Sequence, residues 1–238
     1  MKIMLIALLK SFRRKVSNLI HPVSSCSYLS NGKYSNEIYW YRRGKNYLAE
    51  FELHDELARK LFVEQESVFV DVLKSIEFRS ALELGCGFGR MLKLLLENFS
   101  LERLVGVDVS EDQIANARKL LKRFGGGELY CGNIKELDFP NNSFDLVYTS
   151  EVLMHIEDPE HILRNMKRIS RKYVLNLEWQ DTSLPFGPSP NAPWCFNHDY
   201  ERLYQEKGLG IIREVILGKQ QKLFLLENSA NNSQSNAI

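Results

Sequence analysis

The sequence predicts an α/β protein whose mostly parallel, doubly wound sheet of seven strands ends in an antiparallel hairpin. Between residues 80 and 178, short apolar runs typical of strands alternate with longer amphipathic stretches typical of helices. This alternation predicts parallel strands joined by right-handed crossovers. The last two apolar runs are separated by only a few residues. Because so short a link cannot make a parallel crossover, one of these strands must run antiparallel.

The individual elements follow from the spacing of apolar residues. Strands are expected at residues 80–84, 103–108, 128–131, 144–149 and 173–178, followed by the hairpin at 211–217 and 222–227. Apolar residues at helical spacing predict one or two helices within 47–76, and further helices at 90–98, 111–124 and 159–170. Ser110 is the predicted N-cap of the helix at 111–124, and the three glycines from Gly125 should end it.

Charge and cysteine content narrow the partners and the compartment. The chain has 31 Lys and Arg against 30 Asp and Glu, a net charge of +1. It has no broad attraction for phosphate backbones, so nucleic acid is not an expected partner. Four widely spaced cysteines form no C-x-x-C pair, which predicts neither a metal site nor disulfides but reduced thiols in a cytoplasmic protein.

The first twenty residues form a separate feature, because apolar residues there alternate with Lys10, Arg13, Arg14 and Lys15. This pattern is typical of an interfacial helix, and the apolar stretch is too short to span a bilayer. Peripheral membrane contact through residues 1–20 and a helix that caps this domain or a partner are both open. We expect residues 1–46 to form this helix with a linker or cap, 47–228 the main domain, and 229–238 a disordered tail.

The strongest functional signal is a glycine-rich turn, Gly85, Gly87 and Gly89, followed by Asp108 at the end of the next strand. Glycines let the backbone approach a ligand, and a carboxylate so placed can accept hydrogen bonds from a ribose diol. The pattern predicts an adenosine-containing cofactor. Arg90 stands where a dinucleotide motif requires its third glycine, and Glu83 suits a cation better than a pyrophosphate.

These motifs resemble the class I S-adenosylmethionine-dependent methyltransferases, in particular the group that acts on small molecules. The likeness is carried by LELGCGFG (82–89), GVDVS (106–110), the stretch from 131 to 156, and the helix and strand that continue to LNLEW. It covers roughly residues 50 to 227. It implies a Rossmann-like fold, S-adenosylmethionine as cofactor, a methyltransferase domain at 47–228, and methyl transfer to a small-molecule acceptor.

The resemblance also implies roles for single residues. The methionine end of the cofactor would be held by Glu83 and the three glycines, and the ribose by Asp108. The adenine would be held by Asn133, Ile134 and Val109, and Ser150 would also line the cofactor. The family commonly has an acidic residue at the position of Asn133, although an amide oxygen can accept the same hydrogen bond. Asn is also a common turn residue.

The acceptor is less well defined. Ser150, Glu151 and His155 follow the fourth strand, where they could face the transferred methyl, and His155 is the candidate catalytic base. A packing or helix-capping role is the alternative for His155. His198 and Asp199 are weaker candidates, and the alternative for Asp199 is a role at the N-terminus of the helix that begins there. The aromatic loop at 180–197 favours an apolar or ring-bearing acceptor, unless it is a surface loop held by its own aromatics.

Methylation of DNA bases is disfavoured, because the chain reads YTSEV after the fourth strand and lacks the Asn/Asp-Pro-Pro-aromatic pattern of enzymes that methylate DNA bases. Three classes of function remain open. The preferred hypothesis is methylation of a small organic molecule, with a lipid-linked or saccharide precursor suggested by the N-terminal segment. The alternatives are a nicotinamide-dependent oxidoreductase and a non-catalytic scaffold that keeps the cofactor fold.

Overall fold

The structure is a computed structural model that describes residues 29–30, 33–189, 192–218 and 220–228. The chain divides into two compact units, Met1–Tyr39 and Trp40–Ile238. In the first unit, β1 (Leu29–Ser30) pairs with β2 (Lys33–Tyr34), and α2 (Asn36–Glu52) begins. The predicted helix over 1–20 and the predicted tail at 229–238 lie outside the described residues.

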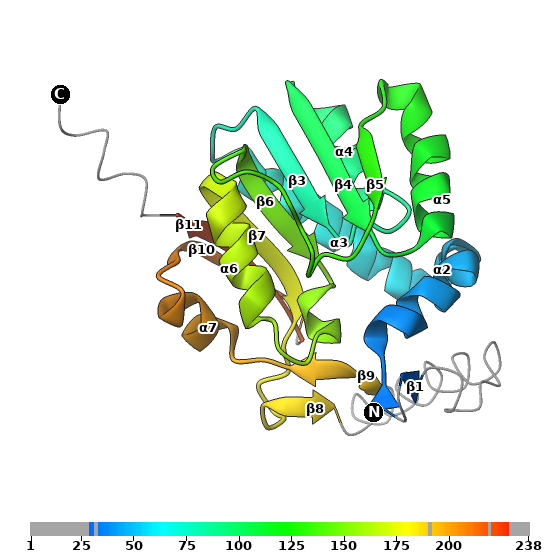
Figure 1. The fold of residues 1–238 in the computed structure, drawn as a ribbon, viewed down its shortest axis with the longest axis vertical. Coiled ribbons are helices and arrows are strands. Elements are labelled where there is room, and N and C mark those ends of the chain that lie inside the picture. Colours follow the sequence, from blue (N-terminus) through cyan, green and yellow to red (C-terminus); the bar gives the residue numbers. More distant parts are fainter. Residues whose placement is uncertain (1–28, 31–32, 190–191, 219, 229–238) are drawn as a thin grey trace. The chain divides into compact units, whose positions relative to one another are not determined.

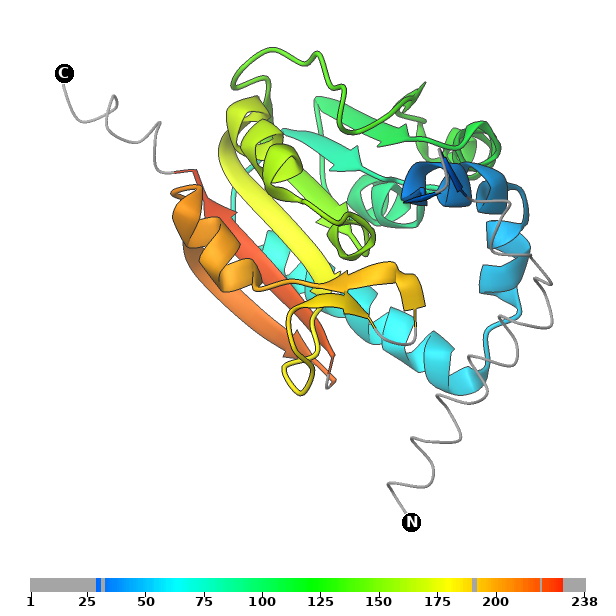
Figure 2. The same ribbon diagram turned by 60° about the horizontal axis from the view of Figure 1, so that its bottom comes forward.

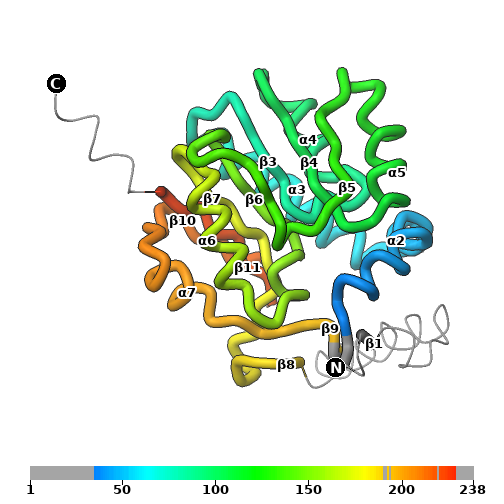
Figure 3. The backbone as a smooth tube through the Cα atoms, in the orientation of Figure 1, coloured from blue at the N-terminus to red at the C-terminus, as the bar shows by residue number. Residues whose placement is uncertain are grey.

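The second unit contains a seven-stranded sheet in the order β10-β11-β7-β6-β3-β4-β5 (Figure 1). Five strands are parallel: β3 (Ser80–Leu84), β4 (Arg103–Asp108), β5 (Glu128–Cys131), β6 (Phe144–Ser150) and β7 (Ser170–Trp179). The last two, β10 (Gly210–Leu217) and β11 (Gln221–Glu227), form a hairpin, and β11 runs antiparallel to β7. Figure 3 follows β11 into its place between β10 and β7. The predicted sheet and its antiparallel hairpin are confirmed.

Helices cover both faces of this sheet (Figure 2). One face packs against α3 (Glu56–Leu73), α4 (Arg90–Asn98) and α5 (Glu111–Leu121), and the other against α6 (Glu160–Ile169) and α7 (Tyr200–Glu206). Two short 3₁₀ turns, η2 (Lys122–Phe124) and η3 (Leu153–His155), and a small hairpin, β8 (Gly187–Ser189) with β9 (Ala192–Asn197), complete the unit. The Ser110 hydroxyl accepts the N–H of Gln113, as predicted for an N-cap.

Two segments differ from the sequence-based expectation. Residues 36–46, expected to belong to the linker or cap, lie inside α2. This helix begins at Asn36 because the Ser35 hydroxyl accepts the N–H of Ile38. The long connection after β7 contains the β8–β9 hairpin and is not a simple loop. Within the part of the chain that the structure describes, no helix combines the length and hydropathy needed to cross a membrane.

The order of the strands places the predicted site. From β3 the chain continues through β4 to β5 on one side, and then returns to β6 on the other side of β3. The carboxyl ends of β3, β4 and β6 therefore meet at one edge of the sheet, where this change of direction separates the segments that follow them. In open α/β sheets, ligands bind at this kind of switch point.

Asp145, near the start of β6, fastens the opposite edge of the sheet. Its Oδ2 accepts the backbone N–H groups of Arg79 (2.9 Å) and Ser80 (3.2 Å), and its Oδ1 pairs with Arg171 at 2.9 Å. Burial alone raises the pKa of this carboxyl. The N–H of Arg79 and the charges of Lys172 and Arg171 more than offset burial, so the pKa is lowered.

Replacing this carboxyl should weaken the sheet. We expect Asp145→Ala to lower the free energy of unfolding by about 2–3 kcal/mol, since charged groups make hydrogen bonds of this strength. Because the pKa of Asp145 is lower in the folded than in the unfolded chain, its contribution is present above the ordinary value of 3.8 and is lost as pH falls further. Urea unfolding from neutral to acid pH measures this difference. The exposed Asp138→Ala is the matched control. If the difference in free energy of unfolding between the wild type and Asp145→Ala did not change with pH, the assignment would be contradicted.

Candidate functional site

The turn after β3 has the backbone that its glycines predict. Gly85, Gly87 and Gly89 have φ values of 76°, 53° and 88°, a region that other residues rarely adopt. A Cβ at Gly85 would lie 2.5 Å from Val152 Cγ2, so this glycine is needed for close packing. A Cβ at Gly87 would meet no protein atom within 4 Å. The turn therefore presents bare backbone at the edge of the sheet, where a ligand can approach it.

Asp108 lies beside this turn at the end of β4. Its Oδ2 accepts the N–H of Gly87 at 2.8 Å, and its Oδ1 accepts the N–H of Ser110 at 2.9 Å. Burial raises the pKa of Asp108, and these two N–H groups oppose that shift. Each carboxylate oxygen can accept more than one hydrogen bond. Asp108 can therefore fix the glycine turn and still accept a diol.

Glu83 lies in β3 directly before the glycine turn, and only 2% of its surface is exposed. The hydroxyl of Tyr148 donates to its Oε2 at 3.1 Å. Burial raises the pKa of Glu83 well above its ordinary value, although Tyr148 and Arg90 oppose the shift. Its carboxyl is thus inside the domain beneath the turn, and its contact with a cofactor stays a prediction.

Arg90 explains why the dinucleotide pattern is absent. Its guanidinium donates to Gln65 Oε1 at 3.1 Å and to Glu66 Oε1 at 3.2 Å, both on α3. It also lies over the ring of Phe62, 5.2 Å from the centroid. The side chain at this position therefore binds α4 to α3, whereas a pyrophosphate turn requires a glycine here for close helix-to-strand packing.

The residues predicted for the adenine have mixed placements. Asn133 Oδ1 accepts the N–H of Lys135 at 3.0 Å, so the turn role is present. An amide oxygen has two lone pairs, and one remains for an adenine amino group. Ile134 packs against the core on the α6 side of the sheet. Val109 is partly buried, and its carbonyl accepts the Cys131 thiol. Their role in adenine recognition stays a prediction.

Helix α2 lies against the carboxyl edge of the sheet, a feature that sequence reasoning missed. Gln113 Nε2 of α5 donates to the Gly44 carbonyl at 2.8 Å. A Cβ at Gly44 would lie 1.9 Å from Ser110 Oγ, so no larger residue fits at this crossing. Further along α2, the ring of Tyr47 lies 6.3 Å from the ring of Phe88 in the glycine turn. The helix therefore contacts both the α5 N-terminus and the cofactor turn.

His155, the candidate base, lies in η3 beyond β6. Its Nδ1 is 2.8 Å from the Trp194 carbonyl, which can only accept, so this nitrogen donates and carries the proton. The Trp40 ring lies 4.5 Å from the imidazole. Burial lowers the pKa of His155 to about 4, although the bond to Trp194 opposes the shift. A neutral imidazole with so low a pKa is a weak base, and its catalytic role stays a prediction.

Ser150 and Glu178 shape the same segment. Ser150 Oγ is buried and has no hydrogen-bond partner among the described residues. Glu178, in β7, accepts the Thr149 hydroxyl at 2.7 Å and the N–H groups of Met154 (3.2 Å) and Val152 (3.3 Å). Burial raises the pKa of Glu178 to about 7, and these donors oppose the shift. The only signal for Glu178 in the sequence is a charge inside the apolar run LNLEW.

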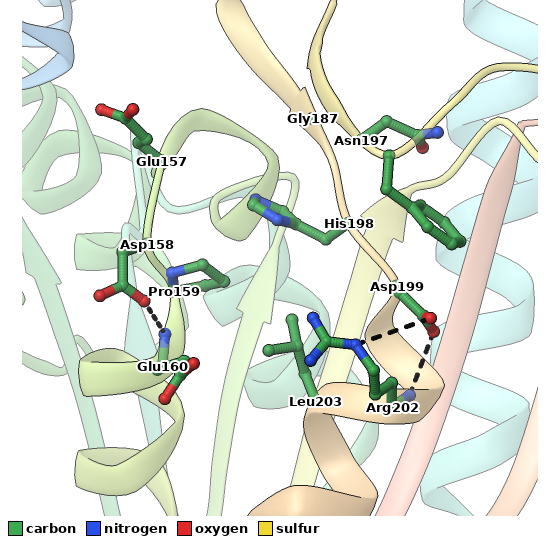
Figure 4. A pocket seen from close by; sticks show the side chains of 11 residues that line it. Glu157, Asp158, Pro159, Glu160, Gly187, Asn197, His198, Asp199, Arg202 and Leu203 are labelled. Carbon is green, nitrogen blue, oxygen red and sulfur yellow. Dashed lines mark hydrogen bonds and ion pairs between the residues drawn. The ribbon is translucent and has the colours of Figure 1, made fainter.

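A separate cleft of about 420 Å³ lies between the segment after η3 and the start of α7. Figure 4 shows Asp158 and Glu160 on one side and Asp199 with Arg202 on the other. His198 contacts the Ile156 carbonyl through Nε2, and Asp199 caps α7 by accepting the N–H of Arg202, the predicted role at this helix N-terminus. None of the residues predicted for the cofactor lines this cleft. Across the described ranges, no cluster of three His, Cys, Asp or Glu side chains could hold a metal ion.

The comparisons with known proteins agree with this geometry. Residues 82–173, which hold the glycine turn, Asp108 and Glu151, match the family described as "Methyltransferase domain". The chain has a methyltransferase domain. The resemblance to the S-adenosylmethionine-dependent methyltransferases that the sequence carries is thereby confirmed.

Three curated relatives illustrate the similarity, and the names of two of them give different substrates. An uncharacterised 37.1 kDa protein in transposon TN4556 of Streptomyces fradiae is 34% identical over 160 residues, 65% of this chain and 44% of the relative. The 24-methylenesterol C-methyltransferase 2 of Arabidopsis thaliana is 27% identical over 144 residues, covering 58% and 37%. A phosphatidylethanolamine N-methyltransferase of Cereibacter sphaeroides is 32% identical over 94 residues, covering 38% and 45%. The chain spans less than half the length of these relatives.

The fold of the methyltransferase domain is also found in solved structures. The magnesium protoporphyrin IX methyltransferase of Synechocystis PCC 6803, solved with bound S-adenosylmethionine, aligns with a TM-score of 0.67 at 12% identity. The alignment covers 83% of this chain and 99% of that chain. At this identity the likeness shows the fold alone, and it confirms the predicted Rossmann-like class.

The low pKa of His155 predicts how it affects stability. In the unfolded chain the His155 imidazole is protonated below a pKa near 6.5, whereas in the folded chain it is protonated only below about pH 4. This residue should therefore destabilise the methyltransferase domain as pH falls from 6.5 toward 4. Since the ring is partly exposed, we expect His155 to lower the free energy of unfolding by about 1–2 kcal/mol over this pH range, which is less than the full pKa shift implies.

Denaturant unfolding of the wild type and His155→Asn between pH 8 and about pH 4 tests this effect. Asn keeps a donor for the Trp194 carbonyl but does not titrate. The variant should lose less stability than the wild type over the acid range, and parallel pH profiles would contradict the assigned protonation.

Proposed function

We propose that this protein catalyses methyl transfer from S-adenosylmethionine to a small organic acceptor. The observation that carries the proposal is the adjacency of Gly87 and Asp108, joined by a hydrogen bond of 2.8 Å at the carboxyl ends of neighbouring strands. Bare backbone for a charged methionine end and a carboxylate for a ribose diol thus lie side by side. Glu83, beneath the same turn, suits a sulfonium or ammonium better than a pyrophosphate.

The protein's main contribution would be positioning. S-adenosylmethionine, when bound, would supply an electrophilic methyl group, which the nucleophilic atom of the acceptor would attack in line with the carbon–sulfur bond, with S-adenosylhomocysteine as the leaving group. Asp108 and the glycine turn fix the nucleoside, and Tyr47 and Trp40 of α2 exclude water from the carboxyl edge of the sheet. Good orientation alone corresponds to roughly 7–11 kcal/mol of barrier. A strong base is therefore not required, which agrees with the low pKa of His155.

Two alternatives predict different ligands. A nicotinamide-dependent oxidoreductase would bind a pyrophosphate at the glycine turn, but the carboxyl of Glu83 beneath it disfavours phosphate, and Arg90 replaces the third glycine. A non-catalytic scaffold would bind S-adenosylmethionine without turning it over. The glycine turn and Asp108 favour S-adenosylmethionine over a dinucleotide, and turnover distinguishes the enzyme from the scaffold.

Isothermal titration with S-adenosylmethionine, S-adenosylhomocysteine and NADH separates the methyltransferase from the oxidoreductase, and transfer of a radiolabelled methyl group to candidate acceptors separates it from the scaffold. We expect both sulfur compounds to bind, and Asp108→Ala to weaken S-adenosylhomocysteine binding by at least about tenfold, the effect of losing one charged hydrogen bond. The exposed Asp138→Ala is the control, and thermal unfolding checks that the Asp108 variant is folded. Tight binding of NADH alone would reverse the assignment, and unchanged affinity in Asp108→Ala would refute the ribose contact.

We also propose that the acceptor is lipid-linked and is met at a membrane surface. Two observations support this: the apolar and basic pattern of residues 1–20 and the sterol and phosphatidylethanolamine substrates in the names of two relatives. A saccharide precursor carried on a lipid would fit the same surface. The cytoplasmic location expected from the cysteines is part of this proposal.

Vesicle sedimentation tests the membrane contact. The full chain should sediment with vesicles that contain anionic lipid, less so at high salt, because basic side chains near a charged surface contribute about 1 kcal/mol each. Arg13, Arg14 and Lys15, all changed to Glu, should abolish this binding. The same change at the exposed Lys119, Lys122 and Arg123 is the control. Equal loss in both variants, or no binding by the wild type, would contradict the proposal.

A further inference from the structure

Glu151, directly after β6, has a backbone conformation that non-glycine residues rarely adopt. Its φ is 57°, in the left-handed region. Holding such a residue there costs free energy, and such residues cluster at active sites. Its N–H donates to the Leu177 carbonyl at 2.7 Å, which fixes the turn. The position lies at the carboxyl edge of the sheet, next to the glycine turn that follows β3.

A chain of hydrogen bonds orients the Glu151 side chain. Arg90, which can only donate, binds Gln65 Oε1 at 3.1 Å, and so Gln65 Nε2 donates to Gln221 Oε1 at 2.8 Å. Gln221 Nε2 is then the donor that binds Glu151 Oε1 at 2.7 Å. The fixed charge on Arg90 thus sets the direction of both amides. Oε1 of Glu151 is held, while its Oε2 has no partner among the described residues.

The surroundings place this carboxylate on the acceptor side of the site. Burial raises the pKa of Tyr47, and the negative charge of Glu151 raises this pKa further. The pKa of Cys195 is raised to about 12, again by burial first and by Glu151 second. Tyr47 belongs to α2 and faces Phe88 of the glycine turn, and Cys195 lies in β9 beside His155. Val152, the next residue, packs against Gly85, so Glu151 adjoins the glycine turn, and its charge acts on Tyr47 of α2 and Cys195 of β9.

We propose that Glu151 binds the acceptor at the point of methyl transfer, its Oε2 accepting a hydrogen bond from an N–H or O–H group on the nucleophilic atom. This inference rests on the proposed function and narrows it. The acceptor is then an amine or an alcohol, because a carbon nucleophile offers no comparable donor. The strained backbone and the bonds from Arg90 through Gln221 serve to hold the carboxylate toward that atom.

Cofactor analogues test this inference without the acceptor. Sinefungin carries an amino group on the carbon that replaces the sulfonium and methyl, whereas S-adenosylhomocysteine has nothing there. Isothermal titration of the wild type should give a lower Kd for sinefungin. Glu151→Gln should reduce this preference by about tenfold, the effect of one charged hydrogen bond, and change the Kd of S-adenosylhomocysteine less than about twofold. Glu157→Gln, an exposed carboxylate beyond the same turn, should behave as the wild type does.

A second variant separates orientation from charge. Gln221→Leu keeps the carboxylate but removes its donor, and we expect it to reduce the preference for sinefungin severalfold. An unchanged preference in Glu151→Gln would overturn the inference. Equal weakening of both analogues would also overturn it, since Glu151 would then serve only to hold the fold. If the wild type binds neither analogue, the proposed function itself fails, and this outcome is distinct from the first two.

Discussion

The site depends on one carboxylate that joins two neighbouring strands. Asp108 accepts the N–H of Gly87, in the turn after β3, and the N–H of Ser110, at the start of α5. The N–H groups of Gly85 and Cys86 already bind the Val107 carbonyl of β4, and Asp108 extends this hold on the left-handed turn to Gly87. Ser110 in turn caps α5 and contacts Gly44, so α2 also rests on this corner. Asp108 therefore holds the glycine turn and the start of α5, and α2 packs against the same corner.

A second buried carboxyl group lies on the β6 side of the glycine turn. Glu178 holds the segment after β6 by accepting N–H groups from Val152 and Met154. Val152 is also the residue that a side chain at Gly85 would strike. The two sides of the site are therefore coupled by direct packing between the glycine turn and this segment. A change in either would move the atoms between which a methyl group must pass, and methyl transfer is sensitive to such displacement.

The sheet could be predicted because its signal is local. Each of the strands at residues 80–84, 103–108 and 128–131 is a short apolar run bounded by polar or glycine residues, and the structure places them at these limits. The glycine turn and Asp108 are equally local, since their meaning comes from spacing along the chain. Ser110 illustrates the same point, because its capping bond spans only three residues.

The parts that sequence reasoning missed depend on contacts between distant residues. The crossing of α2 rests on Gly44 meeting the α5 N-terminus, and no periodic pattern marks a glycine for such a contact. The sequence marks His155 as a base, but in the fold burial lowers its pKa, with the Trp40 ring packed 4.5 Å away, and the bond to the Trp194 carbonyl only partly opposes this shift. The orientation of Glu151 comes from side chains on α3, α4 and β11, and only the fold brings these together.

The most direct test of this account is a crystal structure of the protein grown with S-adenosylhomocysteine. Both ribose hydroxyls should lie within about 2.6–3.2 Å of the Asp108 carboxylate, a normal hydrogen-bond distance, and the amino acid end of the ligand should lie over the backbone of Gly85 and Gly87. A ligand that binds elsewhere, or a ribose that leaves Asp108 bonded only to Gly87 and Ser110, would contradict it.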